Sequence, residues 1–193
     1  MSLIETKTDL LKDLKIEEVP EFTSLDAMAE GETRYLRDLR INLKNTLASE
    51  NFSPKEAYLI ALSIAANEKN DILVRSFSTL AEENGAVKAE IAEAHACASM
   101  LSVNNVFYRF RHFMGKESYS SMPAGIKMNV MMNPVLGKEF FELLSLAISA
   151  VNGCESCVTS HEASLRRLGS SEARIFDAIR LASVVRGLSI AIH

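Results

Sequence analysis

Proline and cysteine are scarce in this chain, which also has no excess of basic residues and no long apolar run. Only four of its 193 residues are Pro and three are Cys. Cys97, Cys154 and Cys157 are too few, and odd in number, for the disulfide scaffold of a small secreted protein. In a reducing compartment, a close cysteine pair is more often catalytic or metal-binding than structural.

The other shortages exclude two classes of partner. No apolar run approaches the roughly 20 residues that a membrane span requires. The polar start MSLIETKTDLLKD lacks the apolar region of a signal peptide. The net charge is −4 and the Lys and Arg residues are scattered, so the chain offers no continuous basic face for nucleic acid. We therefore expect a cytoplasmic protein with no membrane or nucleic-acid partner.

What the chain has in abundance is helical periodicity. Ala, Leu, Glu and Ile recur at spacings of three and four residues, and strand patterns are absent, so we expect an all-α fold. The stretch Ser53-Pro54-Lys55-Glu56 combines a capping serine, a first-turn proline and a glutamate that can complete a capping box. It predicts a helix that runs to about Asn67.

Three further features describe the middle of the chain. A second helix is expected to end at Gly85, and a third to run from about Val87 to Val103, where Asn104-Asn105 interrupts it. Residues 118–137, with two prolines, form the least helical stretch and read as a long connection between two halves.

The two halves resemble one another when the chain is shifted by 84 residues. We interpret this as an internal repeat within a single domain of residues 1–193, with copies at about 53–110 and 137–193. Small apolar residues match by chance in helical proteins, so the matching glycine counts for more than the alanines. The identical positions in the first copy are Leu59, Leu62, Ile64, Ala66, Gly85, Ala89, Ile91, Ala94, Ala98 and Ser99.

Four chemical groups occur in the second copy only. Cys154, Cys157, His161 and Glu142 fall on Asn70, Leu73, Phe77 and Tyr58 in the first. A motif that the scaffold itself required should appear in both copies. The asymmetry therefore indicates that the function lies in the second.

The spacing of these groups predicts a thiol site at the start of a helix. Asn152-Gly153 breaks a helix that begins near Lys138, and a new helix should run from about Cys154 to Gly169. Backbone amides in its first turn favour a thiolate. Cys154, Cys157 and His161 then lie on one face, a turn apart.

This arrangement suits redox chemistry. Cys154 and Cys157 can close a reversible disulfide, and His161 can take a proton from Cys157. If the two helices form a hairpin, Glu142 can orient the imidazole of His161.

Each group also has a simpler interpretation. The cysteines and His161 are three potential zinc ligands, with Glu142 as a hard fourth, although no second C-x-x-C occurs. His161 can be a partly exposed helix histidine, and most helix glutamates are solvated. Elsewhere, Cys97 is expected to be a small core residue, and His95, His112 and His193 have no partner at motif spacing.

Three stretches together resemble the alkyl hydroperoxide reductase D (AhpD) family of the carboxymuconolactone decarboxylase superfamily. They are NNVFYRFRHF, MPAGIKMNVMMNP and the pattern E-x11-C-x-x-C-x3-H, and the likeness covers almost the whole chain. The resemblance implies an all-helical subunit that forms a trimer or a multiple of it. It also implies an antioxidant, thiol-dependent peroxidase with no bound cofactor or metal, which reduces organic hydroperoxides and a partner peroxiredoxin. Electrons would come from a lipoyl group, as dihydrolipoamide, on a 2-oxoacid dehydrogenase component.

The resemblance also implies a role for each site residue. Cys157 would be the attacking thiolate that becomes a sulfenic acid, and Cys154 the resolving cysteine and proton donor. Glu142 and His161 would form a proton relay. Well-matching members carry a histidine just before the second cysteine, where this chain has Ser156. The chain therefore lacks whatever that histidine contributes to proton transfer at neutral pH.

Three alternatives remain open at this point. The same dithiol can serve a pure adaptor that reduces a peroxiredoxin without meeting peroxide itself. A carboxymuconolactone-type decarboxylase is a second alternative, although it has no evident need for two redox cysteines. A zinc-binding or helical interaction module is the third.

Overall fold

The computed structural model describes residues 2–17 and 21–193, and these residues form α-helices with no strand. The expected all-α fold is therefore confirmed. The helices begin with α1 (Leu3–Asp13), α2 (Thr23–Glu30), α3 (Tyr35–Leu47), α4 (Pro54–Asn67) and α5 (Asp71–Glu83). They continue with α6 (Lys88–Met114), α7 (Glu117–Ser120), the 3-10 helix η1 (Asn129–Met132), α8 (Lys138–Val151), α9 (Glu155–Arg167) and α10 (Glu172–Ala191).

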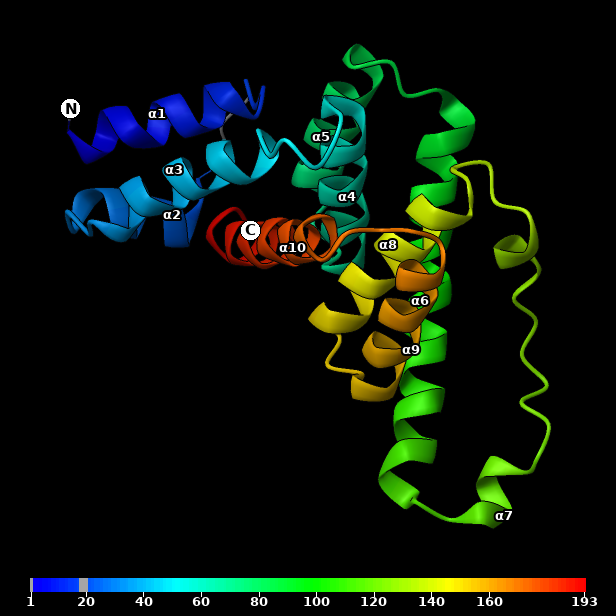
Figure 1. Cartoon of the computed structure of the whole chain (residues 1–193). Helices are drawn as coiled ribbons and strands as arrows, with labels where there is room; N and C mark the ends of the chain where they lie inside the picture. The colour runs from blue at the N-terminus through cyan, green and yellow to red at the C-terminus, as the bar shows by residue number, and fades with distance from the viewer. Residues whose placement is uncertain (1, 18–20) are drawn as a thin grey trace.

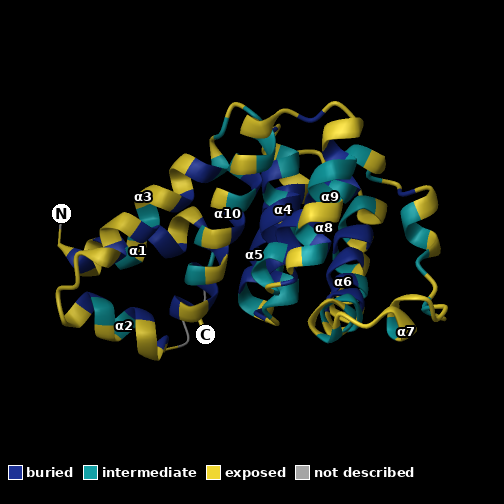
Figure 2. Cartoon of the chain, turned by 60° about the horizontal axis from the view of Figure 1, so that its bottom comes forward, coloured by how far each residue is buried: buried dark blue, intermediate teal, exposed yellow. Residues whose placement is uncertain are grey.

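Two helix hairpins, α4–α5 and α8–α9, form the centre of the molecule. Their first helices, α4 and α8, are buried along nearly their whole length and pack against each other; Figure 2 shows α4 in the colour of buried residues. In Figure 1, α10 lies between these hairpins and the layer formed by α1, α2 and α3, and it contacts α3, α4 and α8. Apolar burial of this kind is the main force that holds such a fold together.

The start of α4 was correctly predicted. Ser53 is its N-cap: the Ser53 hydroxyl accepts the Glu56 amide at 3.2 Å, and Glu56 Oε2 accepts the Ser53 amide at 2.8 Å. Pro54 occupies the first helical position, where a missing N–H costs nothing. The helix ends at Asn67, as expected.

The prediction that Asn104-Asn105 ends the third helix is wrong. Helix α6 continues through both residues to Met114 and ends at Gly115, which has a left-handed backbone. Their side chains are engaged by other elements instead: Asn104 Nδ2 donates to Met128 Sδ, and Asn105 Nδ2 donates to Ser149 Oγ at 2.9 Å. Because these amides bond elsewhere in the fold, they do not compete with the helix backbone.

The second half of α6 extends beyond the hairpins, and the connection after α7 returns alongside it to α8 (Figure 1). Residues 118–137 contain only the end of α7 and the short η1, so the expected long connection is confirmed. Among the described residues, no helix combines the length and apolar character that crossing a bilayer would require.

The helix boundaries fit the spacing of the repeat. Helices α4, α5 and α6 start at residues 54, 71 and 88, and α8, α9 and α10 start 84 residues later, at 138, 155 and 172. Gly85 and Gly169 both adopt a positive φ, of 91° and 92°, after the second helix of each set. Such a backbone suits glycine at a helix end. That the two halves are copies of one unit stays a prediction.

Candidate redox site

The turn between α8 and α9 places the cysteine pair. At the end of α8, the Gly153 amide donates to the Ala150 carbonyl at 3.1 Å and the Cys154 amide to the Ser149 carbonyl at 3.0 Å. These two bonds form a Schellman motif, with Gly153 in the left-handed conformation it requires. The chain is thereby turned back so that α9 packs along α8.

Cys154 and Cys157 are joined by a disulfide. Cys154 is the N-cap residue of α9, one position earlier than the first-turn place that the sequence suggests, and Cys157 is its third helical residue. The sulfurs are 2.02 Å apart and the Cα atoms 5.3 Å apart. An N-cap side chain normally faces the amide of the third residue, so this spacing brings the two sulfurs together at the positive end of the α9 dipole.

The two cysteines differ in their access to solvent. Cys154 is fully buried, whereas Cys157 keeps 7% of its surface exposed. Ser156 directly precedes Cys157 in the sequence, at the position where well-matching AhpD proteins carry a histidine. Its Oγ is 3.8 Å from Cys154 Sγ. Of the two cysteines, Cys157 is therefore the more exposed residue.

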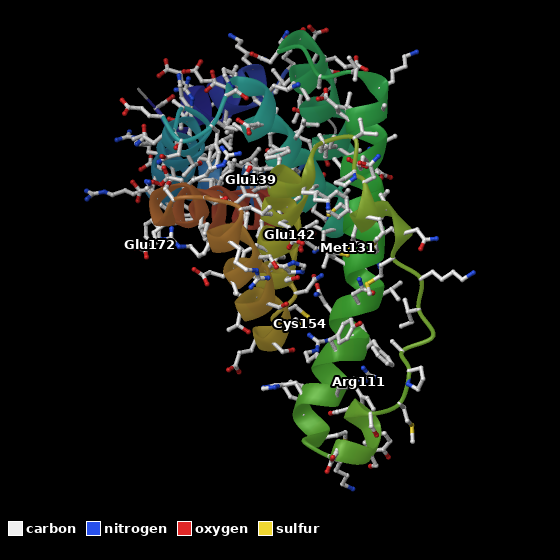
Figure 3. The ribbon with its side chains drawn as sticks, turned by 45° about the vertical axis from the view of Figure 1, so that its right-hand side comes forward. Arg111, Met131, Glu139, Glu142, Cys154 and Glu172 are labelled. Atoms are coloured by element: carbon white, nitrogen blue, oxygen red, sulfur yellow. A yellow bond between two sulfur atoms is a disulfide. The ribbon has the colours of Figure 1, made fainter. Side chains whose placement is uncertain are left out.

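Glu142 and His161 form a hydrogen-bonded pair across the hairpin. His161 Nδ1 is 2.6 Å from Glu142 Oε2, and both side chains are largely buried. A carboxylate at Nδ1 holds the proton there and leaves Nε2 as the basic nitrogen. His161 lies one turn after Cys157 on α9, the spacing at which helix side chains are neighbours. Figure 3 shows Glu142 on α8 between Glu139 and Cys154.

A network of amides supports the turn and was missed by the sequence analysis. The side chains of Asn152 and Asn67 exchange two hydrogen bonds, of 2.9 and 3.1 Å, and Asn152 Nδ2 also donates to Asn105 Oδ1 at 2.9 Å. Arg109 donates to the Asn152 carbonyl at 2.7 Å. The network ties the turn to α4 and α6. In the sequence, the network is visible only as polar residues at positions of the helices where the pattern would lead one to expect apolar residues.

Helix α6 also brings a histidine to the site. His112 Nε2 lies 3.5 Å from Glu155 Oε2, the residue that follows Cys154. The sequence gives no sign of this contact, because Glu155 is far from His112 along the chain. With Arg109, it places two nitrogen-rich side chains of α6 near the start of α9.

The third cysteine is separate from the pair. Cys97 is fully buried and unpaired, as predicted, and its sulfur is 3.6 Å from Ser145 Oγ. Burial raises the pKa of its thiol to about 12, an effect that the Ser145 hydrogen bond only partly offsets. Cys97 is thus a neutral core residue at neutral pH. Among residues 2–17 and 21–193, no cluster of three or more His, Cys, Asp or Glu is placed to hold a metal ion.

Comparison with known proteins places the chain in a family. The family model "Carboxymuconolactone decarboxylase family" matches residues 119–193, the part that carries the cysteine pair. Similar proteins named alkyl hydroperoxide reductase AhpD occur in Anaeromyxobacter dehalogenans (strain 2CP-C), Rhodopseudomonas palustris (strain BisB18) and Brucella canis. They are 40%, 37% and 35% identical to this chain, over 88% of it and 91%, 93% and 97% of their own lengths. The chain therefore belongs to the AhpD family of the carboxymuconolactone decarboxylase superfamily.

Proposed function

We propose that this protein is a thiol-dependent alkyl hydroperoxide reductase that acts in the cytoplasm as an antioxidant enzyme. The observation that carries the proposal is the Cys154–Cys157 disulfide at the start of α9, with the Glu142–His161 pair on the same hairpin. Relatives named for this activity support it.

The first step oxidises Cys157. His161 Nε2 takes the thiol proton, and the thiolate attacks the terminal oxygen of the hydroperoxide. The O–O bond breaks, Cys157 becomes a sulfenic acid, and the alkoxide takes the proton from His161 and leaves as an alcohol. Glu142 stabilises the charged imidazole between these two transfers. The greater exposure of Cys157 favours it over Cys154 as the attacking residue.

The second step closes the disulfide. The Cys154 thiol attacks the sulfenic sulfur of Cys157, an S–S bond forms, and the hydroxyl leaves as water with the proton of Cys154. A dihydrolipoyl dithiol then restores both thiols by two exchanges and is itself oxidised to a cyclic disulfide. This reductant is a co-substrate, and its source in the proposal is the lipoyl-bearing component of a 2-oxoacid dehydrogenase.

Reduction of a peroxiredoxin of the alkyl hydroperoxide reductase C type is the second part of the proposal. The same reduced pair would attack the disulfide of that partner and pass two electrons to it by exchange.

An apolar stripe on α6 supports assembly into a trimer or a multiple of it. Val103, Val106, Phe110 and Phe113 follow one another at intervals of three, four and three residues, so they share one face of the helix. All four are exposed, Phe113 by 75% and Val106 by 62%. An exposed apolar face of this kind marks a protein contact, and light scattering after size-exclusion chromatography tests the trimer directly.

The decisive experiment follows the cysteine pair by mass spectrometry. The reduced protein is treated with one equivalent of tert-butyl hydroperoxide and then with dihydrolipoamide. We expect a Cys154–Cys157 disulfide that dihydrolipoamide reverses, and steady consumption of peroxide when both reagents are in excess. Thiols that stay reduced, or copurifying zinc bound by them, would overturn the redox assignment. Peroxide consumption only when peroxiredoxin is added would show an adaptor instead.

A further inference from the structure

A pocket of about 280 Å³ has Glu142 in its wall, and its other residues take no part in the chemistry above. It lies between the start of α8, the second half of α9 and the segment around η1. Figure 3 shows Met131, from that segment, facing α8 near Glu142. Most of the wall is apolar and consists of Met131, Met132, Pro134, Phe141 and Leu168. Met132 and Leu168 are exposed, by 74% and 46%, so apolar surface remains available to a ligand.

Two cations line the same pocket. Lys138, the first residue of α8, makes no ion pair with any residue in the described ranges. Arg167, near the end of α9, donates to Ser164 Oγ, a hydrogen bond within its own helix. The single carboxylate in the wall, Glu142, is bonded to His161. The positive end of the α8 dipole adds to the potential, so the pocket is suited to an anion.

The pocket adjoins the reactive face of α9, because its wall includes Glu142, the hydrogen-bond partner of His161. Cys157, His161, Ser164 and Leu168 follow one another at intervals of four, three and four residues and therefore form one stripe. The ten residues from Cys157 to Arg167 rise about 15 Å along the helix axis, the length of an extended chain of roughly ten to twelve carbons. A ligand of that length reaches from the cations to the sulfur.

We propose that this pocket binds the carboxylate end of a long-chain fatty-acid hydroperoxide, with the alkyl chain against Met131 and Met132 and the peroxide at Cys157. The proposal rests on the peroxidase function and names its substrate class. The apolar wall contributes affinity through buried surface. Lys138 and Arg167 select the carboxylate and fix the direction in which the chain lies.

A binding experiment tests the pocket without any turnover. Dodecanoate, below its micellar concentration, is titrated calorimetrically into the oxidised protein, with methyl dodecanoate as the uncharged comparison. We expect saturable binding of dodecanoate that weakens about tenfold in the double variant Lys138→Gln/Arg167→Gln, because single exposed charges contribute modestly. Binding should also weaken with salt. Lys127→Gln removes the same charge from the neighbouring connection, outside the pocket wall, and should have no effect.

The outcomes are distinct from those of the peroxidase test. Absence of saturable binding, equal binding of the methyl ester, or unchanged binding in the double variant would overturn the pocket assignment, even if the enzyme consumes tert-butyl hydroperoxide. In steady-state assays, the double variant should raise KM about tenfold for a long-chain carboxylate hydroperoxide and leave kcat unchanged. KM for its methyl ester and for tert-butyl hydroperoxide should not move; an equal rise for all three substrates would refute the proposed selectivity.

Discussion

The hairpins α4–α5 and α8–α9 both reverse the chain in a tight turn and begin a second helix, but they do so with different residues. At the first turn, Lys69 takes the left-handed position and Asn70 caps α5, its Oδ1 accepting the Leu73 amide at 3.0 Å. At the second, Gly153 takes the left-handed position, and Cys154 stands where the capping side chain would be. In the second hairpin, the cap position therefore holds a sulfur that bonds to Cys157 instead of an amide that bonds to the helix.

The next turns of the two hairpins differ in the same way. In α5, Leu73 and Phe77 are fully buried and serve the core. In α9, the corresponding residues are Cys157, which is bonded to Cys154, and His161, which is hydrogen-bonded to Glu142 of α8. The residue of α4 that corresponds to Glu142 is Tyr58. The comparison teaches that one turn geometry can carry two kinds of helix start. One is capped by an amide and packs into the core, and the other holds a disulfide beside a Glu–His pair.

Replacing the sulfurs should have the largest effect. Cys157→Ser removes the proposed nucleophile and should abolish peroxide consumption in the dihydrolipoamide-coupled assay. Cys154→Asn gives α9 the capping residue that Asn70 provides for α5. The amides at the start of α9 should therefore stay protected from hydrogen exchange, while multiple turnover is lost. Cys97→Ala should retain activity, since its thiol is neutral and buried. Turnover by Cys157→Ser would disprove its role.

Breaking the Glu142–His161 pair should slow the reaction without preventing it. Glu142→Gln keeps the shape of the side chain but removes the charge that is proposed to stabilise the imidazolium, and His161→Gln removes the proposed base. General acid–base groups are typically worth ~10² to 10⁴-fold, so we expect single-turnover rates of Cys157 oxidation to fall within that range. The loss should shrink as the pH rises and the thiolate forms unaided. A loss that is independent of pH would instead point to misfolding of the hairpin.

Removing the cap of the first hairpin should affect stability alone. The Asn70 amide also donates to the carbonyls of Ser189 and Ile192 at the end of α10. Asn70→Ala loses the cap and leaves these carbonyls unpaired, at a cost of about 2 kcal/mol in the free energy of unfolding. Urea denaturation measures this cost. Asn42→Ala, on an exposed position of α3, is the matched control, and equal effects would contradict the capping role.

Exchanging the turn residues should have the smallest effect on stability. The change should be destabilising in the second hairpin but not in the first. Gly153 has a φ of 69° and open space around its Cα, so Gly153→Ala should cost about 1 kcal/mol through backbone conformation alone. Lys69 has a φ of 59°, and Lys69→Gly should stabilise the protein or leave it unchanged. The thermal unfolding temperatures of both variants test this expectation. If both variants unfold at a lower temperature than the unchanged protein, or both at a higher one, the expectation is refuted.

Local features of the fold could be predicted from the sequence because they depend on a few neighbouring residues. The start of α4 at Ser53, the break at Asn152-Gly153 and the positive φ of Gly169 follow from capping and turn chemistry within one or two turns. The course of α6 was not predictable in this way. The buried amides of Asn104 and Asn105 look like a helix end until their distant partners, Met128 and Ser149, are known.

The sequence by itself determined an all-helical chain, the cysteine pair at a helix start and a histidine one turn later, because helix periodicity and capping act over short spans. Only the tertiary structure decided what surrounds the pair. Glu142 meets His161 across a hairpin, a contact that the sequence allowed only on the condition that α8 and α9 fold back on each other. Arg109, Asn105 and His112 come from α6. Such contacts depend on how apolar faces pack, and packing is set by the whole core rather than by any local stretch.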